Sequence, residues 1–228
     1  NTVLPRRKDE LTLFDSLPKE VQQDLASQLK TFIFQKKQII HREGFIPTGL
    51  FIIRKGKVKI YRISDNLREI IIHIAGEGEM VGYSALMRKS EYHFWAEAIE
   101  KTELSFLPQK YFYEFIENYP AFSVHLMQEF ARQFDAVMDK MVDILSDQVR
   151  KRTAKTLLWL MQTHGLDDDN KTIKITLTRK DLAHLVATNT ETLVRTLTEL
   201  SREKTIELKR KKISVLDLEK LNKIARLS

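Results

Sequence analysis

The chain has 228 residues, of which 43% are hydrophobic and 30% charged, with a net charge of +7; this is typical of a folded, soluble protein of one large or two modest domains. It contains no cysteine, which excludes disulfides, cysteine-ligated zinc, thiolate-held iron–sulfur clusters and a cysteine nucleophile. No apolar run approaches the roughly 18 residues of a membrane span, and the basic residues 6–8 are not followed by the apolar stretch of a signal peptide, so we expect a cytoplasmic protein without a membrane partner.

Residues 10–30 are expected to form a short helical region. Ser16 is a suitable N-cap and Pro18 suits the first turn. Val21 and Leu25 recur at a spacing of four, which places them on one face of a helix.

Short β-branched and aromatic runs separated by turn residues follow, between residues 31 and 107. The predicted strands are 32–34, 38–41, 50–53, 57–63, 69–74 and 97–107. Several short strands at nearly regular spacing indicate an antiparallel sandwich or barrel, most simply a jelly roll. The fourth strand is expected to have one buried and one solvent-facing side, with Val58, Ile60 and Ile63 opposite Lys57, Lys59 and Arg62.

The pattern becomes helical from about Pro120 to Leu145. A helix of about 26 residues would be roughly 39 Å long, which is long for a helix packed only on its own domain. Its apolar positions step by three or four, which favours a parallel coiled-coil dimer; one long core helix is the alternative. The expected dimer-helix residues are Phe122, Leu126, Phe130, Phe134, Val137, Met141 and Ile144.

The positive charge is confined to the C-terminal third. Residues 148–228 hold 18 basic and 10 acidic groups, whereas the preceding residues hold 20 basic and 21 acidic groups. A basic domain joined to a neutral one suggests a nucleic-acid-binding module, although a basic surface can also serve solubility alone. We therefore expect a sensor domain over 1–118, a dimerisation helix over 119–146 and a DNA-binding domain over 147–228.

Within this basic region, residues 173–175 are expected to form a strand, and two short capped helices follow, separated by a turn near Ala187. Thr178 and Asp181 form a capping box before the first helix, and Thr188 with Glu191 is expected to do the same for the second. Two such helices form a helix-turn-helix. In that motif the second helix enters the DNA major groove, with its N-terminal residues facing the base edges.

Thr190, Glu191, Val194 and Arg195 share one face of this second helix and are the expected base-reading residues. An arginine can bond bidentately to guanine and a glutamate can accept from cytosine, so Glu191 and Arg195 could read a G·C pair. Two alternatives stay open: Glu191 could be only the acid of the capping box, and the pair could be a surface salt bridge.

Two strand candidates, 205–208 and 213–216, flank a basic run and resemble a wing hairpin. A solvated charge run is the alternative, but beside a helix-turn-helix such a tip suits phosphate contact. The expected phosphate-contacting residues are Arg179, Lys180, Lys209, Arg210, Lys211 and Lys212.

A β-roll, a long helix and a winged helix-turn-helix in this order resemble the cyclic-AMP receptor protein/fumarate-nitrate regulator (CRP/FNR) family of bacterial transcription factors. The resemblance is carried by Leu13-Phe14 with Leu17, and by residues 49–58, 76–82 and 191–195. It implies an α+β chain with an N-terminal double-stranded β-helix, the jelly roll of cyclic-nucleotide-binding domains, followed by a long dimerisation helix and a C-terminal winged helix-turn-helix. It also implies a homodimer on a pseudo-palindromic operator of double-stranded DNA, and RNA polymerase could be a further partner.

The resemblance extends to single residues of the DNA-reading helix. Glu191 and Arg195 fall where the family reads its G·C pair. Thr190 stands where the cyclic-AMP receptor has a base-reading arginine, so we expect a different half-site. Ala187 replaces the usual turn glycine.

The sensor end departs from the family pattern. The glutamate that would hold the ribose is replaced by Tyr83, next to Ser84, and the Arg-Ser pair for the phosphate becomes Tyr92-His93. The Thr-Ser pair that reaches the base becomes Val137-Met138. Because a phosphate needs a donor or a positive charge, we expect no cyclic AMP binding in the family manner. These six positions form the expected effector pocket, which has become more apolar and aromatic.

The same residues allow other ligands of the expected effector pocket, and other functions of the chain, to be compared. Haem needs an axial ligand, for which His93, Met138 or the nearby His73 would serve, but each stands alone; a small apolar metabolite or no ligand is the alternative. The six histidines show no metal-ligand spacing, so no metal is expected. A cupin-like metal-dependent enzyme needs a cluster of histidines and an acid, which is absent, so we expect no enzyme; a winged helix used for protein contacts is the remaining alternative.

Overall fold

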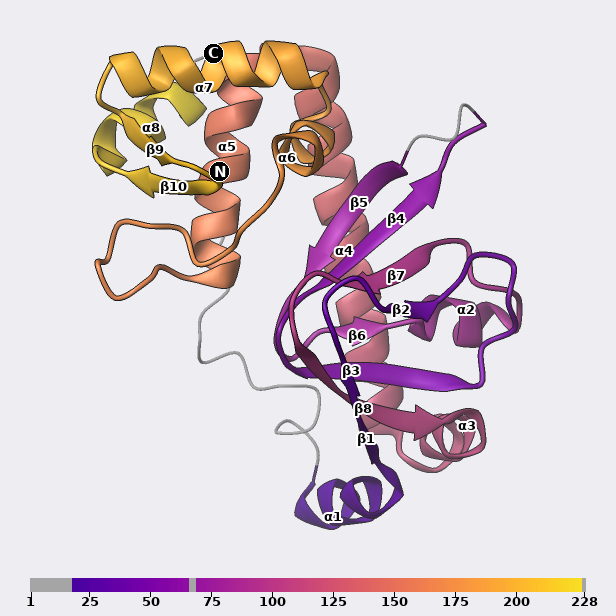
Figure 1. Ribbon diagram of the computed structural model, residues 1–228. Coiled ribbons are helices and arrows are strands. Elements are labelled where there is room, and N and C mark those ends of the chain that lie inside the picture. Colours follow the sequence, from indigo (N-terminus) through magenta and orange to yellow (C-terminus); the bar gives the residue numbers. More distant parts are fainter. Residues whose placement is uncertain (1–17, 66–68, 227–228) are drawn as a thin grey trace. The chain divides into compact units, whose positions relative to one another are not determined.

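The computed structural model describes residues 18–65 and 69–226 (Figure 1). Two compact units divide after Gln133, within helix α4 (Pro120–Ser146). The boundaries expected after residues 118 and 146 coincide with helix ends, because α3 covers Gln109–Asn118 and α4 ends at Ser146. Helix α1 (Lys19–Gln28) has Pro18 at its N-cap. The expected N-cap Ser16, and the residues 13–17 that carry part of the resemblance, lie outside the described residues.

Two four-stranded antiparallel sheets build the N-terminal unit (Figure 1). One has the order β1-β8-β3-β6 and the other β2-β7-β4-β5, so that early strands pair with late ones, as in the predicted jelly roll. The bounds are β1 Lys30–Phe34, β2 Ile39–His41, β3 Gly49–Lys55, β4 Val58–Ile63, β5 Glu69–Ala75, β6 Met80–Val81, β7 Trp95–Ala98 and β8 Thr102–Pro108.

The two faces predicted for β4 are wrong at Lys59 and Ile63. Its register against β5 shifts between Ile60 and Tyr61. The extra residue is Ile72 of β5, whereas β4 keeps an unbroken register against β7. Side chains therefore alternate along β4: Tyr61 shares a face with Lys59 and is buried, and Ile63, three residues from Ile60, lies on the other face from Ile60 and is 38% exposed. Lys59, expected in solvent, is buried and forms an ion pair with Glu69 at 2.9 Å.

The segment expected as one strand over 97–107 is two strands in different sheets, β7 and β8. Thr102 forms the corner between them: its hydroxyl donates to the carbonyls of Glu100 at 3.0 Å and of Lys57 at 3.2 Å. The short β6 and the six-residue helix α2 (Tyr83–Arg88) were not predicted, because neither is long enough to show a period.

Helices α1, α3 and the start of α4 cover the core of the N-terminal unit. The rings of Phe112 and Phe122 meet edge-on at 6.1 Å, and Leu126 lies in the same cluster. Phe122 and Leu126 are 0% and 1% exposed, so their prediction as dimer-helix residues is wrong. Periodicity alone cannot tell which surface an apolar stripe covers, and this first part of the stripe packs on its own protomer.

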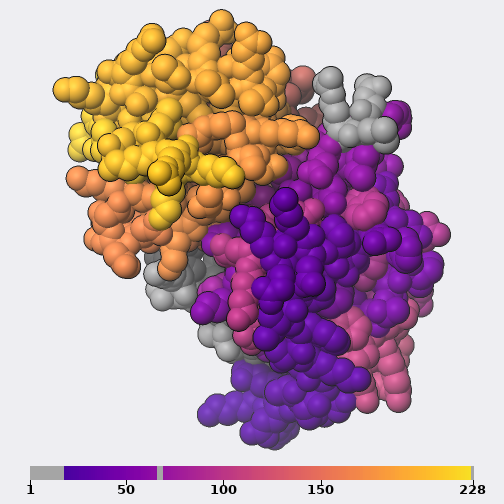
Figure 2. Space-filling view, in the orientation of Figure 1, coloured from indigo at the N-terminus to yellow at the C-terminus, as the bar shows by residue number. Residues whose placement is uncertain are grey.

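The C-terminal unit contains a two-stranded hairpin among helices (Figure 1). Its elements after α4 are α5 Val149–His164, α6 Arg179–Val186, α7 Thr190–Arg202, β9 Ile206–Lys209, β10 Lys212–Val215 and α8 Leu218–Arg226. The strand predicted over 173–175 is wrong, because only isolated bridges form there, Leu166 with Ile173 and Thr172 with Ser214. In Figure 2 the yellow atoms of the last part of the chain lie at the surface of this unit.

Candidate nucleic-acid interface and effector region

The first helix of the pair, α6, begins with the predicted capping box. The Asp181 amide donates to the Thr178 hydroxyl at 3.0 Å, and the Thr178 amide donates to the Asp181 carboxylate at 3.3 Å. The helix ends at Ala187, whose φ of 57° and ψ of 54° are left-handed. Glycine is favoured there, so the alanine holds the turn at some cost in strain.

The second helix, α7, begins one residue later than expected. Its N-cap is Asn189, whose side-chain oxygen accepts from the Thr192 amide at 2.8 Å. The capping box predicted from Thr188 and Glu191 is therefore wrong. Asparagine caps a helix as well as serine or aspartate does, and its one-residue shift leaves the carboxylate of Glu191 without a capping role.

All four predicted base-reading residues are exposed on one side of α7: Thr190, Glu191, Val194 and Arg195. The opposite side is buried and contains Leu193, Leu197 and Leu200. Within the described part of the chain, no ion pair joins Glu191 to Arg195, so the salt-bridge alternative is not observed. The carboxylate of Glu191 and the guanidinium of Arg195 therefore face solvent, while the buried apolar face packs α7 against its own domain.

The wing predicted around the basic run is present. Strands β9 and β10 pair antiparallel, with Lys209 opposite Lys212. Arg210 and Lys211 form the two-residue tip, and the φ of 53° at Arg210 is the left-handed conformation that tight hairpins require. All four side chains are exposed. The tip is tied to α6, because Arg179 donates to the Arg210 carbonyl at 3.1 Å.

Two of the predicted phosphate-contacting residues already form an ion pair with a carboxylate of the protein. Lys209 pairs with Glu207 at 2.9 Å, and Lys212 pairs with Asp167 at 2.6 Å. Hydrogen bonding to Asp167 raises the pKa of Lys212. Exposed pairs of this kind are worth little, with a median of about 0–1 kcal/mol, so a phosphate can replace the carboxylate.

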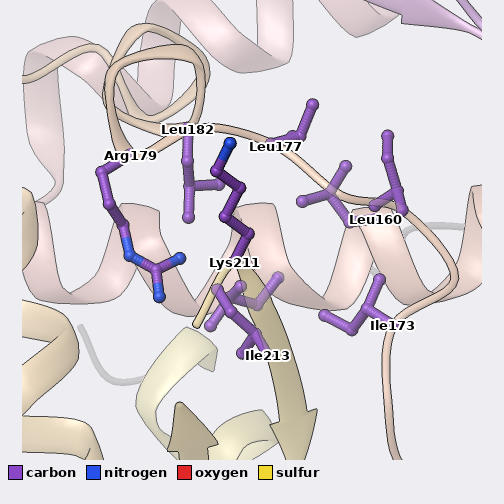
Figure 3. A pocket seen from close by; sticks show the side chains of 9 residues that line it. Leu160, Ile173, Leu177, Arg179, Leu182, Lys211 and Ile213 are labelled. Atoms are coloured by element: carbon purple, nitrogen blue, oxygen red, sulfur yellow. The ribbon is translucent and has the colours of Figure 1, made fainter. Parts of the chain in front are cut away.

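Arg179 and Lys211 also stand over a small hollow in the core of this unit (Figure 3). Its floor is apolar and includes Leu160, Leu182 and Ile213. With a volume of about 10 Å³ it holds no more than a water molecule. The hollow is thus a packing gap beneath the wing, and its two cations lie at its edge.

Tyr83 and Tyr92, which are predicted to stand at the positions of polar groups in a nucleotide pocket, are both buried in the N-terminal unit. The Tyr83 hydroxyl donates to the Gln133 side chain at 2.8 Å, and burial raises the pKa of Tyr83 above its ordinary range. Tyr92 stacks on His41 with ring centroids 3.8 Å apart and planes inclined by 10°. Burial raises the pKa of Tyr92 to about 12, so both phenols are neutral at physiological pH.

Of the other four predicted pocket residues, three are exposed and one is partly buried. His93 is exposed, and its ring bonds the Arg88 guanidinium at 2.8 Å, so its assignment to the pocket is wrong. Ser84 is partly buried on α2. Val137 and Met138 belong to the C-terminal unit and are 57% and 44% exposed.

Metal-ligating residues are scattered. Over residues 18–65 and 69–226, no group of three histidine, aspartate or glutamate side chains could hold a metal ion. His73 bonds Glu79 at 2.7 Å. Sequence reasoning missed two residues that the structure brings forward, His41 beside Tyr92 and Arg152 beside the helix-turn-helix; neither stands in a motif that marks it.

Comparison with known proteins agrees with this arrangement. A family model of the cyclic nucleotide-binding domain matches residues 31–119, and a model of the Crp-like helix-turn-helix domain matches residues 151–224. The cyclic AMP receptor protein of Thermus thermophilus is 29% identical over 216 residues, which is 93% of this chain and 96% of that protein. The CRP-like cAMP-activated global transcriptional regulator of Mycobacterium tuberculosis is 28% identical over 204 residues, 89% of this chain and 91% of that one.

A crystal structure described as a CRP/FNR-family transcriptional regulator of Eubacterium rectale has the same fold. The TM-score is 0.75 at 24% identity, over 95% of this chain and 99% of that chain. The chain belongs to the CRP/FNR family of transcription regulators. The predicted CRP/FNR architecture of β-roll, long helix and winged helix-turn-helix is confirmed.

Helix α7, with its exposed face, lies within the residues that match the Crp-like helix-turn-helix domain. The relatives named above include transcriptional regulators. No helix among the described residues is both long enough and apolar enough to cross a bilayer.

Proposed function

We propose that this CRP/FNR regulator binds a pseudo-palindromic DNA site as a homodimer, reads it with Glu191 and Arg195, and responds to a signal other than cyclic AMP. The observation that carries the proposal is the exposed polar face of α7, which is capped by Asn189 and backed by a buried apolar face. A glutamate and an arginine four residues apart on such a face match the edges of one G·C pair. The wing and α6 supply cations for the phosphates.

The part of α4 from Met127 onward supports the dimer. A series of its exposed apolar residues steps by three and four alternately, the heptad spacing of a left-handed coiled coil. Their exposed fractions lie between 44% and 57%, for Met127, Phe130, Phe134, Val137, Met141 and Ile144. A continuous apolar stripe of this length is rarely left in water. A second copy of the same helix is the partner that covers it with matching spacing.

Selection from a random pool of DNA duplexes, followed by gel shift, tests the DNA-binding proposal. We expect one palindromic sequence to be enriched, with half-sites about one helical turn apart, roughly 34 Å. Affinity should fall steeply as salt rises, because bound phosphates release counterions. Recovery of no preferred sequence, together with salt-insensitive binding, would sink the proposal in favour of a protein-interaction module.

The signal is proposed to differ from cyclic AMP even though two relatives carry that ligand in their names. The residue at the phosphate position is Tyr92, which is buried against His41 and has no charge to offer. The nearby cation Arg88 is engaged with His93 and with the Glu91 carbonyl at 3.3 Å. An anionic phosphate would enter this region without a positive partner, which is costly. A small apolar metabolite fits the aromatic lining better.

Calorimetric titration with cyclic AMP tests this part. We expect no complex in the micromolar range and no change in DNA affinity at saturating nucleotide. A micromolar complex that also activates DNA binding would contradict it. Mass spectrometry and absorption spectroscopy of protein purified from its native host would identify a bound metabolite, and a Soret band would instead identify haem.

A further inference from the structure

The junction between α4 and α5 is fastened to the turn of the helix-turn-helix by one side chain. Arg152, in the first turn of α5, donates to three backbone carbonyls. Its Nη1 bonds Asp147 at 2.6 Å, its Nε bonds Val186 at 3.0 Å, and its Nη2 bonds Ala187 at 3.0 Å. The first carbonyl belongs to the junction, and the other two belong to the end of α6.

The two acceptors at the end of α6 are groups that need a donor. The last carbonyls of a helix have no partner within the helix, and here the caps from Ala187 and Thr188 reach only Ala183 and His184. A planar guanidinium offers several donors in a fixed geometry and places positive charge at the negative end of the helix. Arg152 therefore completes the end of α6.

The junction is itself held firmly to α5. The Asp147 carboxylate, 7% exposed, pairs with Lys151 at 2.9 Å and with Lys155 at 2.7 Å, and Lys155 also contacts Asp143 on α4. Burial opposes ionisation of Asp147, but its bonds to Lys155 and Lys151 outweigh burial and lower its pKa. The last turn of α4 and the first of α5 thus form one cross-linked corner, and Arg152 extends it to the turn.

The turn leads directly into the DNA-reading helix. Ala187, whose carbonyl accepts from Arg152, is followed by Thr188 and by the N-cap Asn189, so a single residue separates the bonded residue from the cap of α7. We infer that Arg152 is a positioning residue: it sets the direction of α7 relative to the α4–α5 corner and thereby controls sequence-specific DNA reading without touching DNA. This inference rests on the proposed DNA-binding function.

The test compares affinity for a duplex selected by the wild-type protein with affinity for random duplex at the same salt. The variants are Arg152→Ala, Arg152→Lys and the matched control Arg150→Ala. Arg150 lies two residues away on α5 and carries the same charge, but it pairs with Glu203 at 2.7 Å. Circular dichroism and thermal unfolding of each full-length variant report whether it folds.

We expect Arg152→Ala to lose about tenfold in affinity for the selected duplex, because three carbonyls lose a charged donor. Its affinity for random duplex and its salt slope should stay unchanged, since positioning does not alter the phosphate contacts. Arg152→Lys keeps the charge but cannot reach all three carbonyls, so it should lose selected-site affinity partially. Arg150→Ala should change both affinities by the same factor.

Each other outcome overturns a defined claim. Equal losses of Arg152→Ala on both duplexes, with a salt slope reduced by about one, would make Arg152 a phosphate contact instead. If Arg152→Ala does not fold, Arg152→Lys decides, and full selected-site affinity in that folded variant overturns the inference. A wild-type protein that selects no sequence overturns the proposed function itself.

Discussion

Acid should destabilise the N-terminal unit through one histidine. His41 stacks on Tyr92, and both of its ring nitrogens are buried. Burial lowers the pKa of His41 from 6.5 to about 4, although the backbone of Phe94 acts in the opposite direction. The folded protein therefore keeps this ring neutral in a pH range where the unfolded chain protonates it.

The direction and size of this change in the free energy of unfolding follow from the difference in the pKa of His41 between the folded and unfolded states. The unfolded state binds the extra proton, so stability is full above the unfolded pKa of 6.5 and falls as the pH drops towards the folded pKa of about 4. The complete loss is about 3 kcal/mol, and about 2 kcal/mol of it is reached by pH 5. This is a large part of the about 5–15 kcal/mol that stabilises a typical domain.

Urea unfolding between pH 7.5 and pH 5 measures the effect. The chain has two tryptophans, Trp95 in β7 and Trp159 in α5. In a Trp159→Phe background, fluorescence reports only the N-terminal unit. His41→Phe keeps an aromatic ring against Tyr92 but cannot titrate, so the difference between the two pH profiles isolates His41. Protein concentration is held constant, because a dimer's stability depends on it.

The reasoning fails if both proteins lose the same stability between pH 7.5 and pH 5, within about 0.5 kcal/mol. It also fails if the histidine protein becomes more stable on acidification. A constant difference at every pH would show only that phenylalanine packs differently, with no role for the proton.

Four substitutions test the remaining structure. Arg195→Ala should cost about 1–3 kcal/mol in binding to a selected duplex and flatten the preference at one base pair; unchanged preference across permuted sites refutes base reading. Phe134→Glu should give folded monomers in sedimentation, because the ring is 56% exposed in the protomer; a dimer of unchanged affinity would contradict the coiled coil. Phe122→Ala, at a fully buried position, should lose about 3–5 kcal/mol of stability in urea unfolding; a loss under about 1 kcal/mol speaks against its place in the core. Thr178→Ala should cost about 0.5–2 kcal/mol by thermal unfolding through loss of the cap; an unchanged midpoint contradicts this.

Local sequence patterns predicted where the helices and strands lie better than they predicted the tertiary contacts of those elements. Alternation and spacing located six strand regions and the order of the domains, because those signals come from neighbouring residues. The bulge in β5 left no trace in the sequence, since it depends on pairing with β4. The break near Thr102 carries no glycine or proline, because the Thr102 hydroxyl makes that corner, with one of its bonds to the carbonyl of Lys57, 45 residues away.

In the candidate site too, features set by neighbouring residues were predicted, and features set by tertiary contacts were not. The reading face of α7 followed from helical spacing alone, and the structure leaves it exposed. Asn189 was overlooked as the cap, because the neighbouring Thr188 satisfies the same local pattern. His93 and His41 could not be ranked from sequence: which of them faces Tyr92 depends on how the segment before β7 packs against β2. The role of Arg152 depends on carbonyls up to 35 residues away.

The acid partners of the wing would make the proposed DNA binding there an exchange reaction. In the proposed DNA complex, Lys209 and Lys212 would each release a carboxylate on binding a phosphate. The phosphate sheds its condensed counterions, but the freed carboxylate attracts mobile cations in turn, so the net ion release is smaller than one per contact. A count of contacts from the salt slope would therefore fall short of the true number. The same carboxylates repel DNA that approaches loosely, which favours only the close fit that displaces them.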